Sequence, residues 1–170
     1  ANQPELLVRE TLVELDRDGI ERRRAADMGT RAVGRGFIDF TRTWIPEQNL
    51  LGELGTGFTQ VMQGFDFSRA LIGLQVIGAA QVTLDETWEY TGTRTAFDQP
   101  LSTFQGVAFP LAEAETLLSA ARLLCQRTLW LKDSGLPHTR EAAMCKWWAP
   151  KTAYDVIHQC LLSHGQYGYL

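Results

Sequence analysis

The sequence contains few of the residues that build a disulfide framework or a metal centre. Its 170 residues include only three cysteines and three histidines. Cys125, Cys145 and Cys160 are odd in number and widely spaced, so they predict free thiols in a reducing cytoplasm rather than disulfides or a C-x-x-C site. Only His158 lies near a cysteine, two residues before Cys160, and that spacing points the two side chains to different faces of a helix. We therefore expect no metal site.

Long apolar runs and an excess of positive charge are also absent. The longest uncharged run, residues 70–84, has 15 residues, whereas a helix that spans a bilayer needs about 20. This run therefore predicts a core helix and no membrane span. The net charge of -4 and the pI near 5.4 give no global basic face, so we expect no nucleic-acid partner. The polar stretch ANQPELLVRE shows neither a signal nor a transit peptide, which favours a cytoplasmic location.

Glycine and proline residues divide the chain into two predicted parts. Residues 1–50 contain short apolar runs at 6–8, 37–40 and 44–45 that are separated by glycines, a pattern typical of strands and turns. A few strands cannot bury both of their faces alone. We therefore predict that residues 1–50 are the end of a β-domain that begins elsewhere, or pair with another chain, and that residues 51–170 form a helical domain.

The second part predicts a mainly α fold. Helices are expected at about 66–92, 102–132 and 138–163, and the short links between them indicate antiparallel neighbours in a bundle. The middle helix is the most periodic, and its predicted core face comprises Leu117, Leu118, Ala121, Leu124, Cys125 and Thr128. Small residues in the first helix, among them Gly73 and Gly78, allow close packing.

Asp66 and Arg69 are the first candidates for chemistry. The stretch GFDFSR precedes the uncharged run and predicts Asp66 as the N-cap of the first helix. A cation at Arg69 opposes the helix dipole, so it requires a nearby anion. That anion is either Asp66, in a local ion pair, or the phosphate or carboxylate of a ligand. The residues alone leave both alternatives open.

The link GTRTAFDQPLSTFQ is the second candidate. It places Arg94, Phe97 and Gln105 around a turn between two long helices. Polar donors beside an aromatic ring suit the phosphate and the ring of a nucleotide, although a solvated loop with one buried phenylalanine gives the same pattern and is the more ordinary interpretation. The final SHGQYGYL is also open, since it is either a helix stop or a turn whose backbone amides are left for a ligand.

Five segments resemble one enzyme family. GFDFSRALIG, LDETWEYTGTRTAFDQPLSTFQ and HGQYGY, in this order and at this spacing, are similar to the flavin-dependent acyl-CoA dehydrogenases. DMGTRAVGRGFIDF and WIPEQNLLGELGTGF resemble the end of that family's middle β-domain and its passage into the C-terminal four-helix bundle. The resemblance covers nearly the whole chain and implies the C-terminal part of a dehydrogenase.

The resemblance implies an oxidoreductase that uses FAD. In this family a carboxylate removes the α-proton of an acyl-CoA thioester while the β-hydrogen leaves as hydride to the flavin, and the electrons usually pass to an electron-transferring flavoprotein. Phe65, Asp66 and Arg69 match the positions that line the acyl-CoA site. The segment GFDFSRALIGLQ with LDETW looks most like members that act on alicyclic thioesters such as cyclohexanecarboxyl-CoA.

The cofactor site implied by the resemblance lies between subunits. Arg94, Thr95 and Phe97 match the R-x-x-F-G turn that reaches the FAD of a neighbouring subunit, with Arg94 toward the pyrophosphate. Gln105 matches a glutamine that joins this contact, and Gly165 matches the first glycine of a late Gly-Gly turn. Because these contacts cross subunits, the resemblance implies a homodimer or a homotetramer.

Several positions depart from the family pattern. Asp98 replaces the glycine of the R-x-x-F-G turn and brings a negative charge near phosphates. Leu162 and Gln166 replace the glutamine before the Gly-Gly turn and its second glycine. Ser68 occupies the position where some members carry a glutamate as base, and a hydroxyl cannot serve as a base at neutral pH. Most members carry the base after the GYGY turn, which here means beyond Leu170.

These departures leave other functions open. The chain by itself is expected to be inactive, as part of a longer enzyme. Ser68 favours a non-catalytic bundle subunit of a heteromeric acyl-CoA dehydrogenase. Acyl-CoA oxidases and nitroalkane oxidases share the architecture and form a further alternative. Without the resemblance, the default interpretation is a helical interaction module without a ligand.

Overall fold

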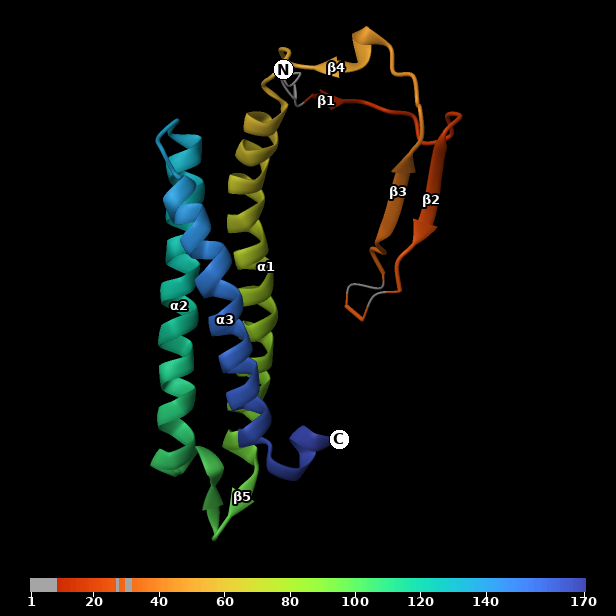
Figure 1. The fold of residues 1–170 in the computed structure, drawn as a ribbon. Helices are drawn as coiled ribbons and strands as arrows, with labels where there is room; N and C mark the ends of the chain where they lie inside the picture. Colours follow the sequence, from red (N-terminus) through yellow and green to blue (C-terminus); the bar gives the residue numbers. More distant parts are fainter. Residues whose placement is uncertain (1–8, 27, 30–31) are drawn as a thin grey trace, which may run out of the picture. The chain divides into compact units, whose positions relative to one another are not determined.

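The computed structural model describes residues 9–26, 28–29 and 32–170 (Figure 1). The chain divides into two compact units, one that ends at Met62 and one that begins at Gln63. The predicted domain division between residues 50 and 51 stays a prediction, because compactness alone does not define a domain boundary.

The first unit contains short antiparallel strands. β2 (Ile20–Arg24) pairs with β3 (Gly36–Phe40). β1 (Glu10–Thr11) pairs with β4 (Leu50–Leu51), and the short helix η1 (Glu47–Asn49) precedes β4. The prediction of a few strands ahead of the helices is confirmed.

The individual strand predictions differ in their outcome. The predicted strand at 37–40 is confirmed, since it forms most of β3. The predicted strand at 44–45 is wrong, because these two residues join no sheet. Pro46 follows them and cannot donate to a ladder, and the Trp44 carbonyl accepts a hydrogen bond from Arg17 Nη1 at 3.3 Å instead. The predicted strand at 6–8 lies outside the described residues.

Charged residues concealed β2 from the sequence pattern. Its sequence is IERRR, and every residue after Ile20 is exposed. Across the hairpin, Arg23 Nη2 donates to Asp39 Oδ2 at 2.7 Å, and its guanidinium lies 5.4 Å from the centre of the Phe37 ring. Such cross-strand contacts stabilise a pair of strands without burial, so the strand carries no apolar alternation.

Three long helices make up most of the second unit. They are α1 (Gly57–Thr93), α2 (Gln105–Asp133) and α3 (Thr139–Ser163). Figure 1 shows them side by side, with successive helices running in opposite directions. The short elements between and after them are β5 (Thr95–Ala96), β6 (Gln99–Pro100), η2 (Leu101–Thr103) and η3 (Gly165–Tyr169). The predicted mainly α fold with an antiparallel helical bundle is confirmed.

Helix α1 begins at Gly57 rather than near residue 66. The stretch before Asp66 already has helical spacing, with Phe58, Val61 and Phe65 at intervals of three and four. A glycine inside a helix costs only about 1 kcal/mol relative to alanine, so Gly64 does not end the helix. The prediction that Asp66 is an N-cap is therefore wrong, because this residue lies inside α1.

The core of the second unit is formed by small and medium-sized side chains from all three helices. The predicted face of α2 is largely correct, since Leu118, Ala121, Cys125 and Thr128 are buried, whereas Leu117 is 36% exposed. The buried hydrophobic cluster comprises Ile77, Ala80, Leu84, Leu111, Ala114, Leu118, Ala121, Cys125, Cys145, Ala149, Ala153, Val156 and Cys160. Many of these residues are alanine or cysteine, so the helix backbones approach closely where they meet.

Gly73 is the position where α1 depends most on a small residue. A Cβ atom added there would lie 2.7 Å from Cys125 Sγ and 3.3 Å from the Cβ of Ala149, whereas a Cβ at Gly78 would meet nothing within 4 Å. Gly73→Ala should therefore lower the free energy of unfolding by about 1–3 kcal/mol through overpacking.

Gly78→Ala is the matched control for this prediction. It lies on the same helix with open space around it, and it should raise the free energy of unfolding by about 0.5–1 kcal/mol through helix propensity alone. Urea unfolding followed by circular dichroism compares the two variants. Equal changes in both would contradict the close approach at Gly73.

Helix α1 is also longer and more apolar than the uncharged run suggested. Within the described part of the chain, it alone has the length and composition that a bilayer crossing requires, and 28% of its most apolar stretch is buried. Core helices of bundles have the same composition, and Ala70, Ile77, Ala80 and Leu84 are each no more than 1% exposed. Three of these residues, Ile77, Ala80 and Leu84, belong to the buried cluster that α1 shares with α2 and α3.

Candidate functional site

The first candidate group is centred on Asp66, which is 6% exposed. Its Oδ1 accepts a hydrogen bond from Arg69 Nη1 at 2.7 Å, and its Oδ2 accepts one from Thr139 Oγ1 at 2.6 Å. Thr139 is the first residue of α3. The local ion pair that the sequence left open is therefore present, and the same carboxylate also ties α1 to the start of α3.

Four further side chains belong to this group, namely Phe65, Phe67, Ser68 and Lys132. Phe65 is 50% exposed on α1, and Ser68 Oγ donates to the Phe65 carbonyl at 3.1 Å. Lys132, from the last turn of α2, places Nζ 4.6 Å from the centre of the Phe67 ring. The α1 segment at residues 65–69 therefore carries two aromatic rings and a cation, and Lys132 of α2 lies over one of these rings. The side chain of Arg69 remains 26% exposed beside them.

The second candidate group begins with the hairpin that links α1 to α2. β5 pairs with β6 through Thr95 opposite Pro100 and Ala96 opposite Gln99. The two residues of the turn, Phe97 and Asp98, both have positive φ, at 54° and 64°. Two-residue hairpin turns of this kind favour asparagine and glycine, which explains why the turn has no clear sequence signal.

The remainder of the second group lies after α3. The His164 ring stacks on the Tyr90 ring, with centroids 4.2 Å apart and an angle of 15° between the planes, and Tyr167 meets Tyr90 edge-on at 6.4 Å. His164 Nε2 lies 3.2 Å from Thr87 Oγ1. Gly165 follows with a φ of 57°. Three aromatic rings thus hold the segment after α3 against α1.

A pocket of about 560 Å³ joins the two halves of this second group. Its lining comprises Tyr90, Arg94, Ala96, Leu101, Gly106, Val107, Gln159, Leu162, Ser163, His164, Gly165, Gln166 and Tyr167. Arg94 is exposed, and its guanidinium makes no ion pair with any residue in the described ranges. A cation, several amide and hydroxyl groups and an apolar wall together suit a ligand that carries both a phosphate and a ring.

The structure brings only some of the predicted cofactor residues together. Arg94 and Gly165 line the pocket. Thr95, Phe97 and Gln105 lie nearby on the hairpin and at the start of α2, where they are exposed. The ring of Phe97 is 90% exposed and meets only the edge of the Phe104 ring, at 6.3 Å. Asp98 does not line the pocket.

His164 and its two supports on α1 are the residues that sequence reasoning missed. The histidine lies 74 positions from Tyr90 and 77 from Thr87. Nothing local to either segment signals such a contact. The only hint was the position of His164 at the start of a Gly/Tyr turn.

The cysteines offer no chemistry in the native state. All three are free and buried. Burial, and secondarily the neighbouring Cys145, raises the pKa of the Cys125 thiol from 9.0 to about 12. Burial also raises the pKa of the Cys160 thiol, and a side-chain contact with Thr87 acts in the opposite direction. Thiols in this state are poor nucleophiles and poor metal ligands.

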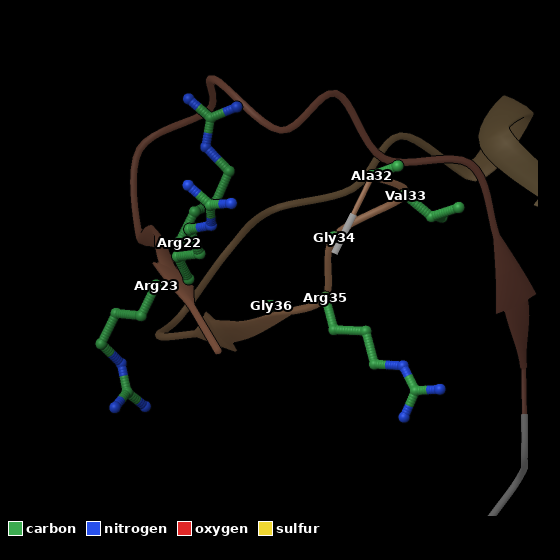
Figure 2. Close-up of a pocket in the computed structure, with 8 residues that line it drawn as sticks. Arg22, Arg23, Ala32, Val33, Gly34, Arg35 and Gly36 are labelled. Carbon is green, nitrogen blue, oxygen red and sulfur yellow. The ribbon is translucent and has the colours of Figure 1, made fainter. Parts of the chain in front are cut away.

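A second hollow, of about 470 Å³, lies at the β2–β3 hairpin and is rich in arginine. Figure 2 shows the side chains of Arg22, Arg23 and Arg35 pointing away from one another rather than toward a common point. Binding of a phosphate group requires cations and donors that converge. This hollow is therefore a weaker candidate than the pocket beside His164.

Comparison with known proteins identifies the family of the segment that contains these sites. The family described as acyl-CoA dehydrogenase, C-terminal domain, matches residues 55–170. The chain belongs to the acyl-CoA dehydrogenase family. The resemblance noted from the sequence is confirmed, and the pocket beside Arg94 and His164 lies within the acyl-CoA dehydrogenase match.

Three relatives illustrate the similarity. The mitochondrial short-chain specific acyl-CoA dehydrogenase of Mus musculus is 40% identical over 143 residues, which are 84% of this chain and 35% of that protein. The CarC subunit of the caffeyl-CoA reductase-Etf complex of Acetobacterium woodii is 32% identical over 160 residues, 94% of this chain and 42% of that protein. The structure of butyryl-CoA dehydrogenase from Megasphaera elsdenii superposes with a TM-score of 0.88 at 30% identity, over 95% of this chain and 43% of that one.

The acyl-CoA dehydrogenase chain described here spans less than half the length of these relatives, between 35% and 43%. The match covers α1, α2, α3 and the hairpin between α1 and α2. Both candidate groups therefore lie in the part of the chain whose family is established.

Proposed function

We propose that this chain is part of an FAD-dependent acyl-CoA dehydrogenase, which removes two hydrogens from an acyl-CoA thioester to give the enoyl-CoA. The observation that carries the proposal is the pocket that joins Arg94 of the hairpin with Gly165 of the segment after α3. These segments lie far apart in the sequence, and both were assigned to the cofactor by family resemblance. Membership of the family and the names of the relatives support the same activity.

The residues of the pocket fit part of an FAD molecule. Arg94 lines the pocket and forms no ion pair with the residues that the structure describes, so its guanidinium suits a pyrophosphate. Gly165 has a positive φ and open space where a Cβ would lie, so a ligand can approach the backbone there. Asp98, whose charge would oppose a phosphate, lies outside the pocket lining. When bound, FAD would supply the acceptor for the hydride that leaves the β-carbon.

The exposed hairpin residues suit a contact with a second subunit. Thr95, Phe97 and Gln105 project from the same link as Arg94 but lie outside the pocket. An almost fully exposed phenylalanine in a strained turn gains little in an isolated chain. We propose that these three residues contact the cofactor of a neighbouring subunit in a homodimer or homotetramer.

The substrate side of the proposal rests on the group around Asp66. Arg69 is partly exposed and Phe65 half-exposed, so both are available to an acyl-CoA thioester. Asp66 acts through Arg69 rather than directly, because its carboxylate is only 6% exposed and is held by Arg69 and Thr139. Ser68 donates its hydroxyl to the Phe65 carbonyl and is no base. We propose that the carboxylate that takes the α-proton lies beyond Leu170.

The names of the relatives suggest substrate and partner. Two of them carry short acyl groups in their names, butyryl-CoA among them, and the Etf complex of a third indicates an electron-transferring flavoprotein as the acceptor. We propose a short acyl-CoA as the substrate, with cyclohexanecarboxyl-CoA as the alternative that the sequence suggested. A cytoplasmic location also stays a prediction.

Flavin binding and reduction test the proposed function. The full protein should purify with flavin absorption bands, or acquire them when FAD is added, and anaerobic addition of butyryl-CoA should bleach those bands. Cyclohexanecarboxyl-CoA in a parallel titration distinguishes the two substrate proposals. A full protein that takes up no flavin from added FAD would contradict the assignment.

Arg94→Ala should weaken FAD binding about tenfold to a hundredfold, because a charged hydrogen bond of about 1.5–3 kcal/mol disappears. Arg22→Ala is the matched control, since Arg22 is also an exposed arginine but lies on β2 at the other hollow. It should leave FAD affinity unchanged. Fluorescence titration of the FAD-free protein measures the FAD dissociation constants of both variants. Equal losses of affinity in the two variants would show that Arg94 is not part of the FAD site.

Ser68 favours a second candidate function. A chain with serine at the alternative base position suits a non-catalytic subunit that completes the flavin site of another polypeptide. In that case the protein should purify together with a second, flavin-bearing chain. An active homomer would exclude this candidate, and rapid flavin reoxidation by oxygen in the same preparation would indicate an oxidase instead of a dehydrogenase.

A further inference from the structure

The contacts of His164 determine where its ring carries a proton. Thr87 Oγ1 donates its hydrogen to the Thr83 carbonyl at 2.7 Å, as threonines inside helices often do. A hydroxyl has one hydrogen, so Thr87 has only an acceptor left for His164 Nε2 at 3.2 Å. We infer from this arrangement that Nε2 of the neutral imidazole carries the proton and donates it to Thr87 Oγ1.

Two contacts fix the orientation of this ring on α1. Thr87 is fully buried, so the atom that accepts from Nε2 is itself immobile. Tyr90 lies one turn further along the helix and stacks on the face of the imidazole at 4.2 Å. A hydrogen bond at the edge and a ring on the face together leave the imidazole little freedom.

His164 also belongs to the wall of the pocket, which residues 164–167 form, so its fixed orientation affects that wall. His164 ends α3 and directly precedes η3, and it lines the pocket together with Gly165, Gln166 and Tyr167. Gly165 has a positive φ and no neighbour within 4 Å of where a Cβ would lie, so no other part of the chain that the structure describes packs against the turn at this position. The stacked imidazole and the edge-on ring of Tyr167 both hold this wall against Tyr90 of α1.

We propose that His164, through Thr87 and Tyr90, is a positioning residue that holds the wall at 164–167 in the shape that receives the cofactor. This inference rests on the proposed function, because the ligand is FAD. A protein whose binding-competent conformation is only partly populated binds its ligand more weakly by that fraction. Loss of the latch formed by Thr87, Tyr90 and His164 should therefore appear as weaker binding rather than as loss of the fold.

Flavin affinity of the FAD-free full protein is the first measurement. His164→Phe keeps the stack but removes the donor, and Thr87→Val removes the acceptor. Each should weaken FAD binding about threefold to tenfold, the effect of one neutral hydrogen bond. The double variant should bind no more weakly than either single variant, because both remove the same bond. Thr87→Ser keeps the hydroxyl and should restore the affinity of the unsubstituted protein.

His158→Phe is the matched control. His158 also stacks on a tyrosine, Tyr154, with centroids 6.3 Å apart, but it is exposed and lies outside the pocket. Its replacement should leave FAD affinity unchanged. Unchanged affinity in His164→Phe and Thr87→Val, in a protein that does bind FAD, would overturn the latch, and so would losses that add in the double variant.

The protonation state of the ring gives a second measurement that does not depend on FAD. Nitrogen-15 spectra of the imidazole at pH 8.5 should show the Nε2–H form of His164 in the unsubstituted protein, and a loss of that preference in Thr87→Val. An Nδ1–H form would overturn the latch even if flavin binds. A protein with the Nε2–H form that takes up no flavin would retain the latch and refute the proposed function, so the two failures are distinct.

Discussion

Asp66→Ala is expected to lower the free energy of unfolding by about 3 kcal/mol, because it removes one partner of a largely buried ion pair. The carboxylate is 6% exposed and accepts from both Arg69 and Thr139. After the substitution, the guanidinium of Arg69 keeps only partial access to water, and α1 loses its polar contact with the start of α3. Urea unfolding monitored by circular dichroism measures the change.

Asp155→Ala provides the comparison for this prediction. Asp155 also pairs with a cation on its own helix, Lys151, but both side chains are more than half exposed. Exposed pairs of this kind contribute at most about 0.5 kcal/mol. A loss for Asp66→Ala as small as that for Asp155→Ala would show that the buried carboxylate does not hold α1 to α3.

Stability is expected to fall steeply at alkaline pH because of Cys125. Burial first, and then the neighbouring Cys145, raises the pKa of this thiol from 9.0 to about 12. Above pH 9 the unfolded chain releases the proton while the folded chain keeps it, so the unfolded state binds fewer protons and stability decreases as pH rises. The contribution is fully present below pH 9 and declines by about 1.4 kcal/mol for each pH unit up to about pH 12.

Cys125→Ala isolates this effect from the other groups that titrate at high pH. Lysines and tyrosines affect both proteins, whereas only the unsubstituted chain contains the Cys125 thiol. The free energy of unfolding, measured by urea titration at several values of pH between 8 and 11 under reducing conditions, should fall more steeply in the unsubstituted protein. Parallel curves would show that the thiol titrates in the folded state as it does in the unfolded state.

The sequence was sufficient for the features that depend on periodic burial. The spacing of Leu118, Ala121 and Cys125 predicted the core face of α2, because these side chains lie on one stripe of the helix that faces α1 and α3 and is buried. Gly73 was expected to allow close packing for the same reason. Such features are local, and the pattern of apolar residues determines them directly.

The features that sequence reasoning missed depend on particular long-range contacts or on rare backbone conformations. Asp66 reads as a helix cap, yet its second oxygen bonds Thr139, 73 positions away. The turn at Phe97 and Asp98 uses two positive φ angles without a glycine, so no turn motif marks it. In both cases the conformation depends on a contact or a backbone strain that exists only in the folded chain, so the local sequence does not indicate it.

The candidate site also combines features that the sequence predicted with features that it did not. Family resemblance selected Arg94 and Gly165, and the structure places both at one pocket. The family resemblance could not select His164, because the role of that residue depends on a threonine and a tyrosine that lie one turn apart on α1. The resemblance therefore predicted which segments meet, and the structure was needed to show what holds them together.

The burial of all three cysteines has a practical consequence for spectroscopy. Maleimide dyes react with exposed thiolates, and the native thiols are neither exposed nor readily ionised. A single cysteine introduced at an exposed site such as Ser119 on α2 would therefore be the preferred point of attachment. Fluorescent or spin labels can thus be placed on the helices one at a time, with the natural cysteines left in the sequence.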